Sequence, residues 1–369
     1  MRRVPIDLLH EGMVVGRSIL NAEGQILLTQ DTILTSKYIQ RLSQLGFASI
    51  YIKDGLSNID VPDIVSEKTR VYVTQTLKET SEYLKKRGKL NIRSVQKSVA
   101  LLVDELLANR NVLFNLEDIR TYDGYLLGHS INVGILSIII AISMGYDQLK
   151  LQEIGIGAVL HDIGKTLIST DILNKPGPLT PIEFNCVRKH SEFGFEILRT
   201  NQEISLLSAH VAFQHHERWD GTGYPRGLVA DQITQHARIV AVADVFDALI
   251  ADRQYRPGYP TNLALAIVKD GIGKHFDPLV VNHLIANVAA FPVGSIVLLN
   301  TGEIAVVTET HKDHPQKPVI RIIFDAKHRR LKQPRTIDLS TLSRFWIKET
   351  LTEPEINKLI SNSPAESVG

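Results

Sequence analysis

The spacing of apolar residues changes twice along the chain, from short runs to long helical patterns and back to short runs. Residues 115–288 are periodic apolar sequence over most of their length, with loops at 174–178 and 219–228, and this spacing predicts helices. Two further helical patterns lie between 64 and 109, and the second places four apolar residues on one helix face: Val95, Val99, Leu102 and Leu106. Asp277-Pro278 suits the start of another helix, with Asp as its cap. The middle of the chain is therefore predicted to be helical.

Shorter apolar runs near the two ends predict small β-rich modules. Residues 25–28 and 48–52 suit strands, with a turn at 21–24, and between them lies a helix that Thr35 or Ser36 can cap and Gly46 can end. Residues 54–63 have the composition of a linker, and three more strands are expected at 295–299, 305–308 and 319–323.

The predicted fold is therefore multidomain, with a mainly α-helical core flanked by small β-rich N- and C-terminal modules. We expect an N-terminal regulatory module at 1–60, linking or regulatory helices at 61–114, a catalytic domain at 115–288, a C-terminal β module at 289–350 and a tail at 351–369. The last residues, 361–369, are small and polar and are expected to be disordered.

Composition narrows the class of protein only a little. The 41 basic and 40 acidic residues nearly cancel, which argues against DNA or RNA as a partner. A basic run at 310–335 could contact nucleotides or membrane phosphates, but a solvated face that protects an edge strand is the favoured interpretation. The single cysteine, Cys186, fits a reducing compartment. The start of the chain lacks a signal-peptide pattern, and residues 131–146, the longest uncharged stretch, are too short for a transmembrane span, so we expect a cytoplasmic protein.

Histidines and aspartates in the helical block supply the candidate chemistry. A lone histidine on an apolar helix face is usually a core residue, so no single position carries the argument. Two adjacent pairs and three further residues together are hard to explain by packing, and they match the side chains that bind divalent metals: His129, His161, Asp162, His190, His215, His216 and Asp244.

The spacing of these residues also has a geometric meaning. Adjacent side chains such as those of His161 and Asp162 diverge on a helix, so both reach one site only where the helix ends, and Gly164 suits such an end. Asp162 can then bridge two metals, one on each oxygen. Asp244 follows the apolar run 239–243, where a carboxylate is costly unless a cation meets it. The sequence therefore predicts a metal-dependent hydrolase.

Residues from about 120 to 288 resemble the HD-GYP family, a branch of the HD metal-dependent phosphohydrolases. The resemblance is carried by motifs in the order and spacing of the family: Gly128-His129-Ser130, His161-Asp162-Ile163-Gly164-Lys165, Lys189-His190, the run from His215 to Pro225, and Ala243-Asp244-Val245-Phe246-Asp247-Ala248. The helical core is accordingly expected to have an HD-type fold.

The resemblance implies hydrolysis of cyclic di-GMP to linear pGpG and on to GMP, with two divalent metal ions, iron or manganese, and a hydroxide that bridges them. It implies that the seven histidines and aspartates bind the ions, that Asp162 bridges them, and that Lys165 approaches the scissile phosphate. Arg253 and Arg256 would bind phosphate or guanine, although an exposed salt bridge is the alternative for both. The loop Gly223-Tyr224-Pro225 is linked in the family to the shape of the substrate site and to contacts with diguanylate cyclase (GGDEF) domains. The alternative is a structural turn whose aromatic rings pack on the core.

One position departs from the family pattern. Some members have a glutamate four residues before the first ligand histidine, where it helps to hold a third metal, whereas this chain has Tyr125. We therefore expect two metals, and the second step, from pGpG to GMP, is in doubt.

Two alternatives to this function stay open. One is a catalytically weak or inert cyclic di-GMP receptor or interaction module, and the other is a phosphohydrolase of another cyclic nucleotide. The regions before residue 115 are interpreted as a regulatory or dimerising half, so a homodimer is possible from the sequence, but the face that contains Val95 could equally pack within the chain.

Overall fold

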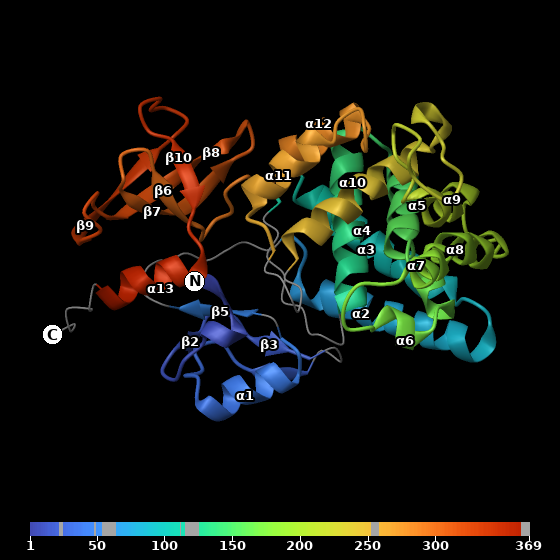
Figure 1. The fold of residues 1–369 in the computed structure, drawn as a ribbon, viewed down its shortest axis with the longest axis horizontal. Helices are drawn as coiled ribbons and strands as arrows, with labels where there is room; N and C mark the ends of the chain where they lie inside the picture. The colour runs from blue at the N-terminus through green and yellow to red at the C-terminus, as the bar shows by residue number, and fades with distance from the viewer. Residues whose placement is uncertain are drawn as a thin grey trace.

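The computed structural model describes residues 1–21, 25–47, 49–53, 64–110, 112–114, 125–251 and 258–362. A helical block forms one side of the molecule, and two β modules lie beside it (Figure 1). The predicted fold class is confirmed in this arrangement. Of the predicted turn at 21–24, only residue 21 is among the described residues, and the predicted linker at 54–63 lies wholly outside them.

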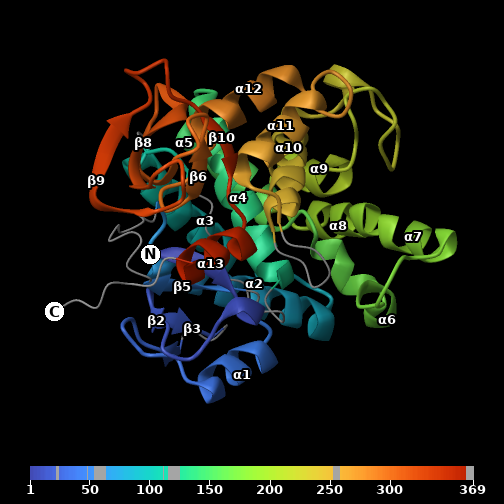
Figure 2. The ribbon, with the colours of Figure 1, turned by 60° about the vertical axis from the view of Figure 1, so that its left-hand side comes forward.

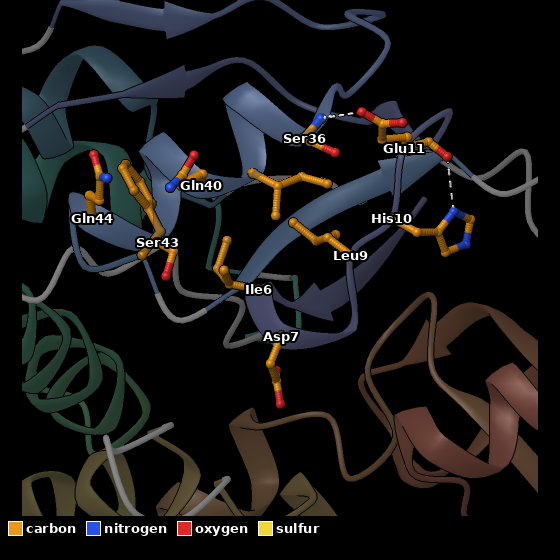
Figure 3. A pocket seen from close by; sticks show the side chains of 11 residues that line it. Ile6, Asp7, Leu9, His10, Glu11, Ser36, Gln40, Ser43 and Gln44 are labelled. Atoms are coloured by element: carbon orange, nitrogen blue, oxygen red, sulfur yellow. Dashed lines mark hydrogen bonds between the residues drawn. The ribbon is translucent and has the colours of Figure 1, made fainter.

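The N-terminal module is an antiparallel sheet with one helix. Its strands have the order β1-β5-β2, a separate hairpin pairs β3 with β4, and the bounds are β1 (Arg2–Pro5), η1 (Ile6–Leu8), β2 (Val14–Val15), β3 (Ile19–Leu20), β4 (Ile26–Leu28), α1 (Ser36–Gln44) and β5 (Ser49–Lys53). The hydroxyl of Thr35 accepts a hydrogen bond from the backbone N–H of Tyr38 and so caps α1. Gly46, with φ of 75°, follows the helix end as expected. A shallow pocket beside α1 is lined by apolar and polar residues, among them Ile6 and Gln40 (Figure 3).

The helical block contains the helices predicted from the apolar period. Its elements are α2 (Glu67–Arg87), α3 (Ile92–Ala108), α4 (Tyr125–Ser143), α5 (Gln148–Val159), η3 (Ile163–Leu167), α6 (Thr170–Leu173), α7 (Pro181–Arg188), α8 (His190–Arg199), α9 (Leu206–Gln214), η4 (Ala230–Gln232), α10 (Gln235–Ile250), α11 (Thr261–Asp270) and α12 (Pro278–Asn287). As predicted, Asp277 caps α12: its carboxylate accepts a hydrogen bond of 2.8 Å from the N–H of Leu279. Helix α4 lies at the centre, in contact with α2, α3, α5, α10 and α12.

Helices α2 and α3 share a hydrophobic core with the helices after residue 125. The face that includes Val95 and Val99 is fully buried against this core, so it packs within the chain. The core thus extends across the predicted boundary between 114 and 115. That boundary stays a prediction, but α2 and α3 are structurally part of the block that they precede.

The C-terminal module has more strands than the sequence indicated. Five strands follow the order β10-β6-β7-β8-β9, with bounds β6 (Ile296–Leu299), β7 (Ile304–His311), β8 (His314–Phe324), β9 (Arg330–Asp338) and β10 (Ile347–Thr350). The three predicted strands correspond to β6, β7 and β8. Strand β9 was not predicted because most of its residues are exposed, and an edge strand without a buried face shows no apolar alternation.

A helix occupies the segment predicted as a tail. Helix α13 (Glu353–Asn362) packs Ile356 against the sheet of the C-terminal module, whereas residues 363–369 lie outside the described residues. The other side of α13 meets the N-terminal module (Figure 2). There the buried guanidinium of Arg2 pairs with Glu353 and donates a hydrogen bond of 3.4 Å to Asn357. None of the helices in the described ranges is long and apolar enough to cross a membrane.

Candidate active site

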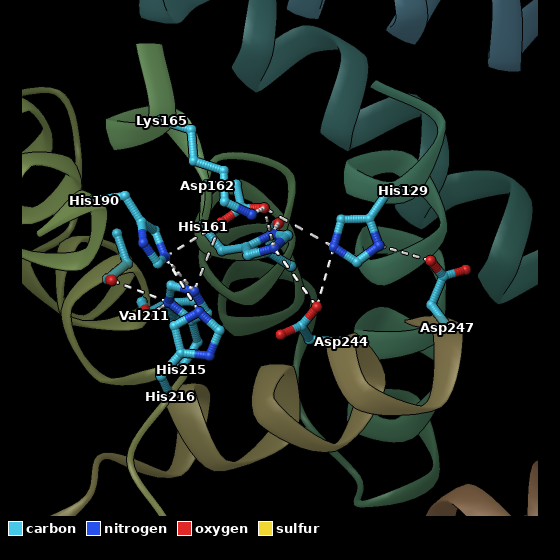
Figure 4. A network of polar contacts seen from close by, with 12 residues as sticks. His129, His161, Asp162, Lys165, His190, Val211, His215, His216, Asp244 and Asp247 are labelled. Carbon is cyan, nitrogen blue, oxygen red and sulfur yellow. Dashed lines mark hydrogen bonds and ion pairs between the residues drawn. The ribbon is translucent and has the colours of Figure 1, made fainter. Parts of the chain in front are cut away.

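The seven predicted ligands converge in the helical block, on α4 and α10 and at the ends of α5, α8 and α9 (Figure 4). His129 projects from α4 and Asp244 from α10, while the other ligands lie at helix ends. As the sequence predicted, His161 and Asp162 follow the end of α5, and His215 and His216 follow the end of α9. His190 is the first residue of α8. Both side chains of each adjacent pair can face one site, because the pair lies beyond the last helical turn, where neighbouring side chains are no longer forced apart.

The two carboxylate oxygens of Asp162 face different histidines. Oδ2 lies 3.3 Å from Nε2 of His161 and 4.0 Å from Nε2 of His129. Oδ1 lies 3.4 Å from Nε2 of His190 and 3.8 Å from Nε2 of His215. Asp162 therefore stands between two groups of ring nitrogens, with one oxygen directed to each group.

The remaining two ligands complete these groups. Oδ1 of Asp244 lies 3.0 Å from Nε2 of His129 and 4.0 Å from Nε2 of His161, on the Oδ2 side of Asp162. Nε2 of His216 lies 3.1 Å from Nε2 of His190, on the opposite side. Among the described residues, three overlapping sets of ligand atoms lie close enough to hold a metal, with all atoms of a set within 4.8 Å of one another: Asp162, His190, His215 and His216; His129, His161 and Asp162; and His161, His215 and Asp244.

Backbone carbonyls orient three of the ligand histidines. In each, Nδ1–H donates to a carbonyl three or four residues earlier, which leaves Nε2 with a free lone pair directed into the cluster. The pairs are His161 with Ala158 at 2.7 Å, His190 with Val187 at 2.6 Å, and His215 with Val211 at 3.1 Å. His129 differs, because its Nδ1 donates to the side chain of Asp247 at 2.7 Å.

Burial and neighbouring charges set the protonation of the cluster. Burial lowers the pKa of His190, of His215 and of His216, the last to about 3, so these rings are neutral and can donate lone pairs. Burial alone would raise the pKa of Asp162, but Lys165, His161 and His190 outweigh it and hold that pKa well below its usual range. His129 is different again: burial would lower its pKa, but hydrogen bonds to Asp244 and Asp247 raise it to about 10.

Two buried atoms of the cluster have no hydrogen-bond partner among the described residues: Nε2 of His161 and Oδ1 of Asp162. Buried polar atoms are almost always paired, so unpaired acceptors inside the cluster indicate that a cation belongs there. Imidazole and carboxylate together suit borderline and hard divalent metals. The residues therefore fit divalent metal binding.

Lys165 lies beside the cluster, in the short helix η3. Its Nζ is 2.5 Å from Oδ2 of Asp162, and its side chain is 24% exposed, so its charge borders both the cluster and solvent. Gly164 allows η3 to lie directly on α8. A β-carbon at Gly164 would lie 2.0 Å from the carbonyl oxygen of His190 and 2.5 Å from the backbone nitrogen of Gly194. Close approach of two backbones thus positions Asp162 and Lys165 against His190.

The loop that contains Gly223-Tyr224-Pro225 covers one side of the cluster. The ring of Tyr224 lies over the ring of His216, with 4.7 Å between the two ring centroids. The guanidinium carbon of Arg188 lies 4.4 Å from the centroid of the same Tyr224 ring. The loop is held by buried Glu217, whose carboxylate accepts hydrogen bonds from the N–H groups of Arg226 and Leu228 at 2.8 and 3.0 Å. Tyr224 is half-buried and its ring contacts His216 of the cluster, so both the site role and the structural turn stay open for this loop.

Some predicted site residues cannot be located in this way. Arg253 and Arg256 lie outside the described residues, and Tyr125 begins α4 with a side chain that is also outside the description. Conversely, Asp247 and Arg188 were not predicted as site residues. A signal for Asp247 was available, because an aspartate three positions after Asp244 lies on the same helix face. No comparable signal exists for Arg188, whose contact with Tyr224 depends on how the loop folds.

Comparisons with known proteins agree with this geometry. Residues 102–280 match the HD domain family, and residues 296–359 match a KOW domain associated with the HD domain. A cyclic di-GMP phosphodiesterase, PA4108, from Pseudomonas aeruginosa is 38% identical over 242 residues, which are 64% of this chain and 58% of that protein. The 3'3'-cGAMP-specific phosphodiesterase 3 from Vibrio cholerae is 40% identical over 154 residues, which are 42% of this chain and 33% of that protein. The chain thus matches 58% of the length of the first relative and 33% of the length of the second.

A solved structure shares the fold. Bd1817, a HDG"Y"P protein from Bdellovibrio bacteriovorus, superposes with a TM-score of 0.50 at 20% identity, over 77% of this chain and 97% of that one. At this identity the likeness concerns the fold alone. The match to the HD model, the HD-GYP motifs and the converging ligands agree with one another. Residues 102–280 of this chain match the HD domain family and carry motifs that resemble those of its HD-GYP branch.

Proposed function

We propose that this chain is a metal-dependent phosphodiesterase that opens the ring of cyclic di-GMP to linear pGpG. The observation that carries the proposal is the position of Asp162, with one oxygen facing His161 and His129 and the other facing His190 and His215. A carboxylate that directs one oxygen to each of two groups of ring nitrogens suits a pair of divalent ions. Phosphodiesterase activity in the relatives supports the same chemistry.

The proposed ligands are the seven residues of the cluster, divided between the two oxygens of Asp162. One set is His129, His161 and Asp244, and the other is His190, His215 and His216, with Asp162 common to both. Two ions bound there would neutralise charge on the phosphodiester and lower the pKa of water. Iron or manganese is the proposed metal, because the set contains imidazole and carboxylate and no thiolate.

The residues of the chain have separate tasks in this reaction. Asp162 would hold the metal ions, and Lys165 adds a positive charge at the edge of the cluster, where charge grows on the phosphate oxygens in the transition state. Tyr224, lying over His216, excludes water from one side and bounds the space for a base. Arg253 and Arg256 are proposed as contacts to phosphate or guanine, since a guanidinium suits both.

Further parts of the proposal concern the rest of the molecule. The N-terminal module and helices before residue 115 are proposed as regulatory, and the Gly223-Tyr224-Pro225 loop as a contact for a GGDEF domain. A homodimer and a cytoplasmic location stay predictions, and so does a site for two metals and not three.

Two alternatives follow from specific observations. Similarity to the Vibrio cholerae enzyme supports 3'3'-cGAMP as a second candidate substrate, because the two cyclic dinucleotides differ in one base while the phosphodiester chemistry is the same. A nucleotide-binding protein with little or no turnover is the other alternative. The complete set of ligands favours the enzyme, because a receptor has no need for all seven.

The test is turnover of cyclic di-GMP and of 3'3'-cGAMP by protein purified without oxygen and loaded with Fe²⁺ or Mn²⁺. We expect linear product from the wild type and from Asp171→Ala, a matched control that removes an exposed aspartate from α6. Asp162→Ala should yield none. Tight binding of nucleotide without turnover would refute the enzyme, and preferential cleavage of 3'3'-cGAMP would replace the proposed substrate.

A further inference from the structure

We propose that Asp247, Asn132 and Arg70 form a positioning network for the metal ligand His129, and that helix α2 acts on the metal site through Arg70. The inference rests on the metal-binding part of the proposed function and is independent of the substrate. It assigns a role to a helix that precedes the HD match at 102–280.

His129 depends on tertiary contacts in a way that three other ligand histidines do not. His161, His190 and His215 each donate a hydrogen bond to a backbone carbonyl three or four residues earlier in the chain. Folding of the local segment is therefore enough to orient these rings. His129 is held by Asp247, a side chain from another helix, α10. Its orientation therefore changes if the packing of α10 against α4 changes.

Both carboxylate oxygens of Asp247 accept hydrogen bonds from side chains of α4, and Figure 4 shows the one from His129. Oδ2 accepts a hydrogen bond of 2.7 Å from Nδ1 of His129, and Oδ1 accepts one of 3.0 Å from Nδ2 of Asn132. The side chain of Asp247 is completely buried, so these donors balance a charge that water does not reach. A carboxylate bonded to Nδ1 fixes the ring, keeps Nε2 free for a metal and makes it a stronger donor.

Asn132 connects this pair to α2. Its amide nitrogen donates to Asp247, so its amide oxygen points the other way, and that oxygen lies 3.5 Å from Nη1 of Arg70. Arg70 thereby supports the orientation of the Asn132 amide in which the nitrogen faces Asp247. The contacts run from α2 to α4, to α10 and back to His129 on α4.

The first turn of α2 is fixed in place by a second contact. Glu105 of α3 accepts hydrogen bonds from the backbone N–H of Ser66 at 2.7 Å and from the hydroxyl of Thr69 at 2.6 Å. Arg70 also lies close enough to Glu105 for its charge to favour the ionised carboxylate. Arg70 therefore stands where α2 docks on α3, and movement of α2 at this end would withdraw it from Asn132.

The expected effects decrease with distance from the metal. Loss of a carboxylate partner of a ligand histidine typically weakens metal binding by about 10- to 100-fold. Asp247→Asn, which keeps the size of the side chain and removes its charge, should fall in that range. Arg70→Ala acts through Asn132 and should weaken binding by a smaller factor, about 3- to 10-fold. Arg70→Lys, which keeps the cation, should restore part of the loss.

The experiment is a titration of the full chain with Co²⁺, followed by its visible absorption bands, and with Mn²⁺, followed by equilibrium dialysis. Arg93→Ala is the matched control: Arg93 lies on α3, and its guanidinium pairs with Glu203 at 3.3 Å, away from the network. The band positions report the ligand field, which a purely structural role of Arg70 would leave unchanged. Thermal unfolding in EDTA checks that each variant is folded.

A double-mutant cycle tests whether Asp247 acts through His129. In a His129→Ala background, Asp247→Asn should cause no further loss of affinity, because the ligand it orients is gone. Independent, additive losses would overturn the positioning role. If Arg70→Ala and Arg93→Ala have equal metal affinity and equal spectra, the role of α2 is overturned. This comparison does not need Asp247→Asn, so it still tests the role of α2 if that variant does not fold. Absence of metal binding in the wild type would instead refute the proposed function itself.

Discussion

Gly164→Ala should damage the active site without altering any ligand. The β-carbon of an alanine would lie 2.0 Å from the carbonyl oxygen of His190, whereas a carbon–oxygen contact needs about 3.3 Å. The backbones of η3 and α8 must therefore separate by about 1.3 Å, the difference between these distances. Because Asp162 precedes one backbone and His190 begins the other, the separation moves two proposed ligands apart.

The size of the effect follows from this displacement. A misplacement of about 1 Å in a catalytic site costs on the order of 100-fold in rate, and overpacking costs about 1–3 kcal/mol of stability. The assays are turnover of cyclic di-GMP, metal content and thermal unfolding. Gly88→Ala is the control: its β-carbon would meet nothing within 4 Å, but its φ of 66° makes alanine unfavourable by about 1–2 kcal/mol. It should lose similar stability and keep its turnover. Wild-type turnover and stability in Gly164→Ala would refute the reasoning.

Three further outcomes are expected. Lys165→Met should lower kcat by about 10²–10³-fold with metal content unchanged by mass spectrometry, and an unchanged kcat would exclude Lys165 from the reaction. Glu217→Ala leaves the N–H groups of Arg226 and Leu228 without their acceptor and should cost about 1–3 kcal/mol, seen as a lower Tm together with a raised KM; an unaltered Tm would mean that other contacts hold the loop. Chelation with EDTA should lower the free energy of unfolding by about 2.7 kcal/mol if the metal was present at 100 times its Kd, and an identical Tm with and without EDTA would argue against the metal site.

The sequence predicted what depends on local patterns. Helical periods located the block, and the adjacent pairs at 161–162 and 215–216 correctly implied helix ends, because two neighbouring side chains cannot otherwise face one point. The convergence of the seven predicted ligands followed from motifs whose order reflects one fold. These inferences needed no knowledge of how distant segments pack.

What the sequence did not predict depends on long-range contacts or on exposed surface. The contact between Arg70 and Asn132 joins residues 62 positions apart and follows from the docking of α2 on the block. Strand β9 is mostly exposed and basic, and α13 is a short helix with one buried anchor, Ile356, so neither has a strong apolar period. The shared core of α2 and α3 with the later helices likewise has no signature in a single segment.

The pairing of Arg2 with Glu353 has a consequence for dissecting the molecule into parts. The two residues are 351 positions apart, and both side chains are largely buried. Removing one partner of a buried ion pair costs about 3–5 kcal/mol, since the other charge is left unpaired. A version of the chain cut after α12 would therefore lose more than its C-terminal sheet, because the buried guanidinium of Arg2 in the first strand would lose the carboxylate of Glu353. The two terminal modules are thus mutually dependent, and a fragment that omits either is a poor guide to how the other behaves in the whole chain.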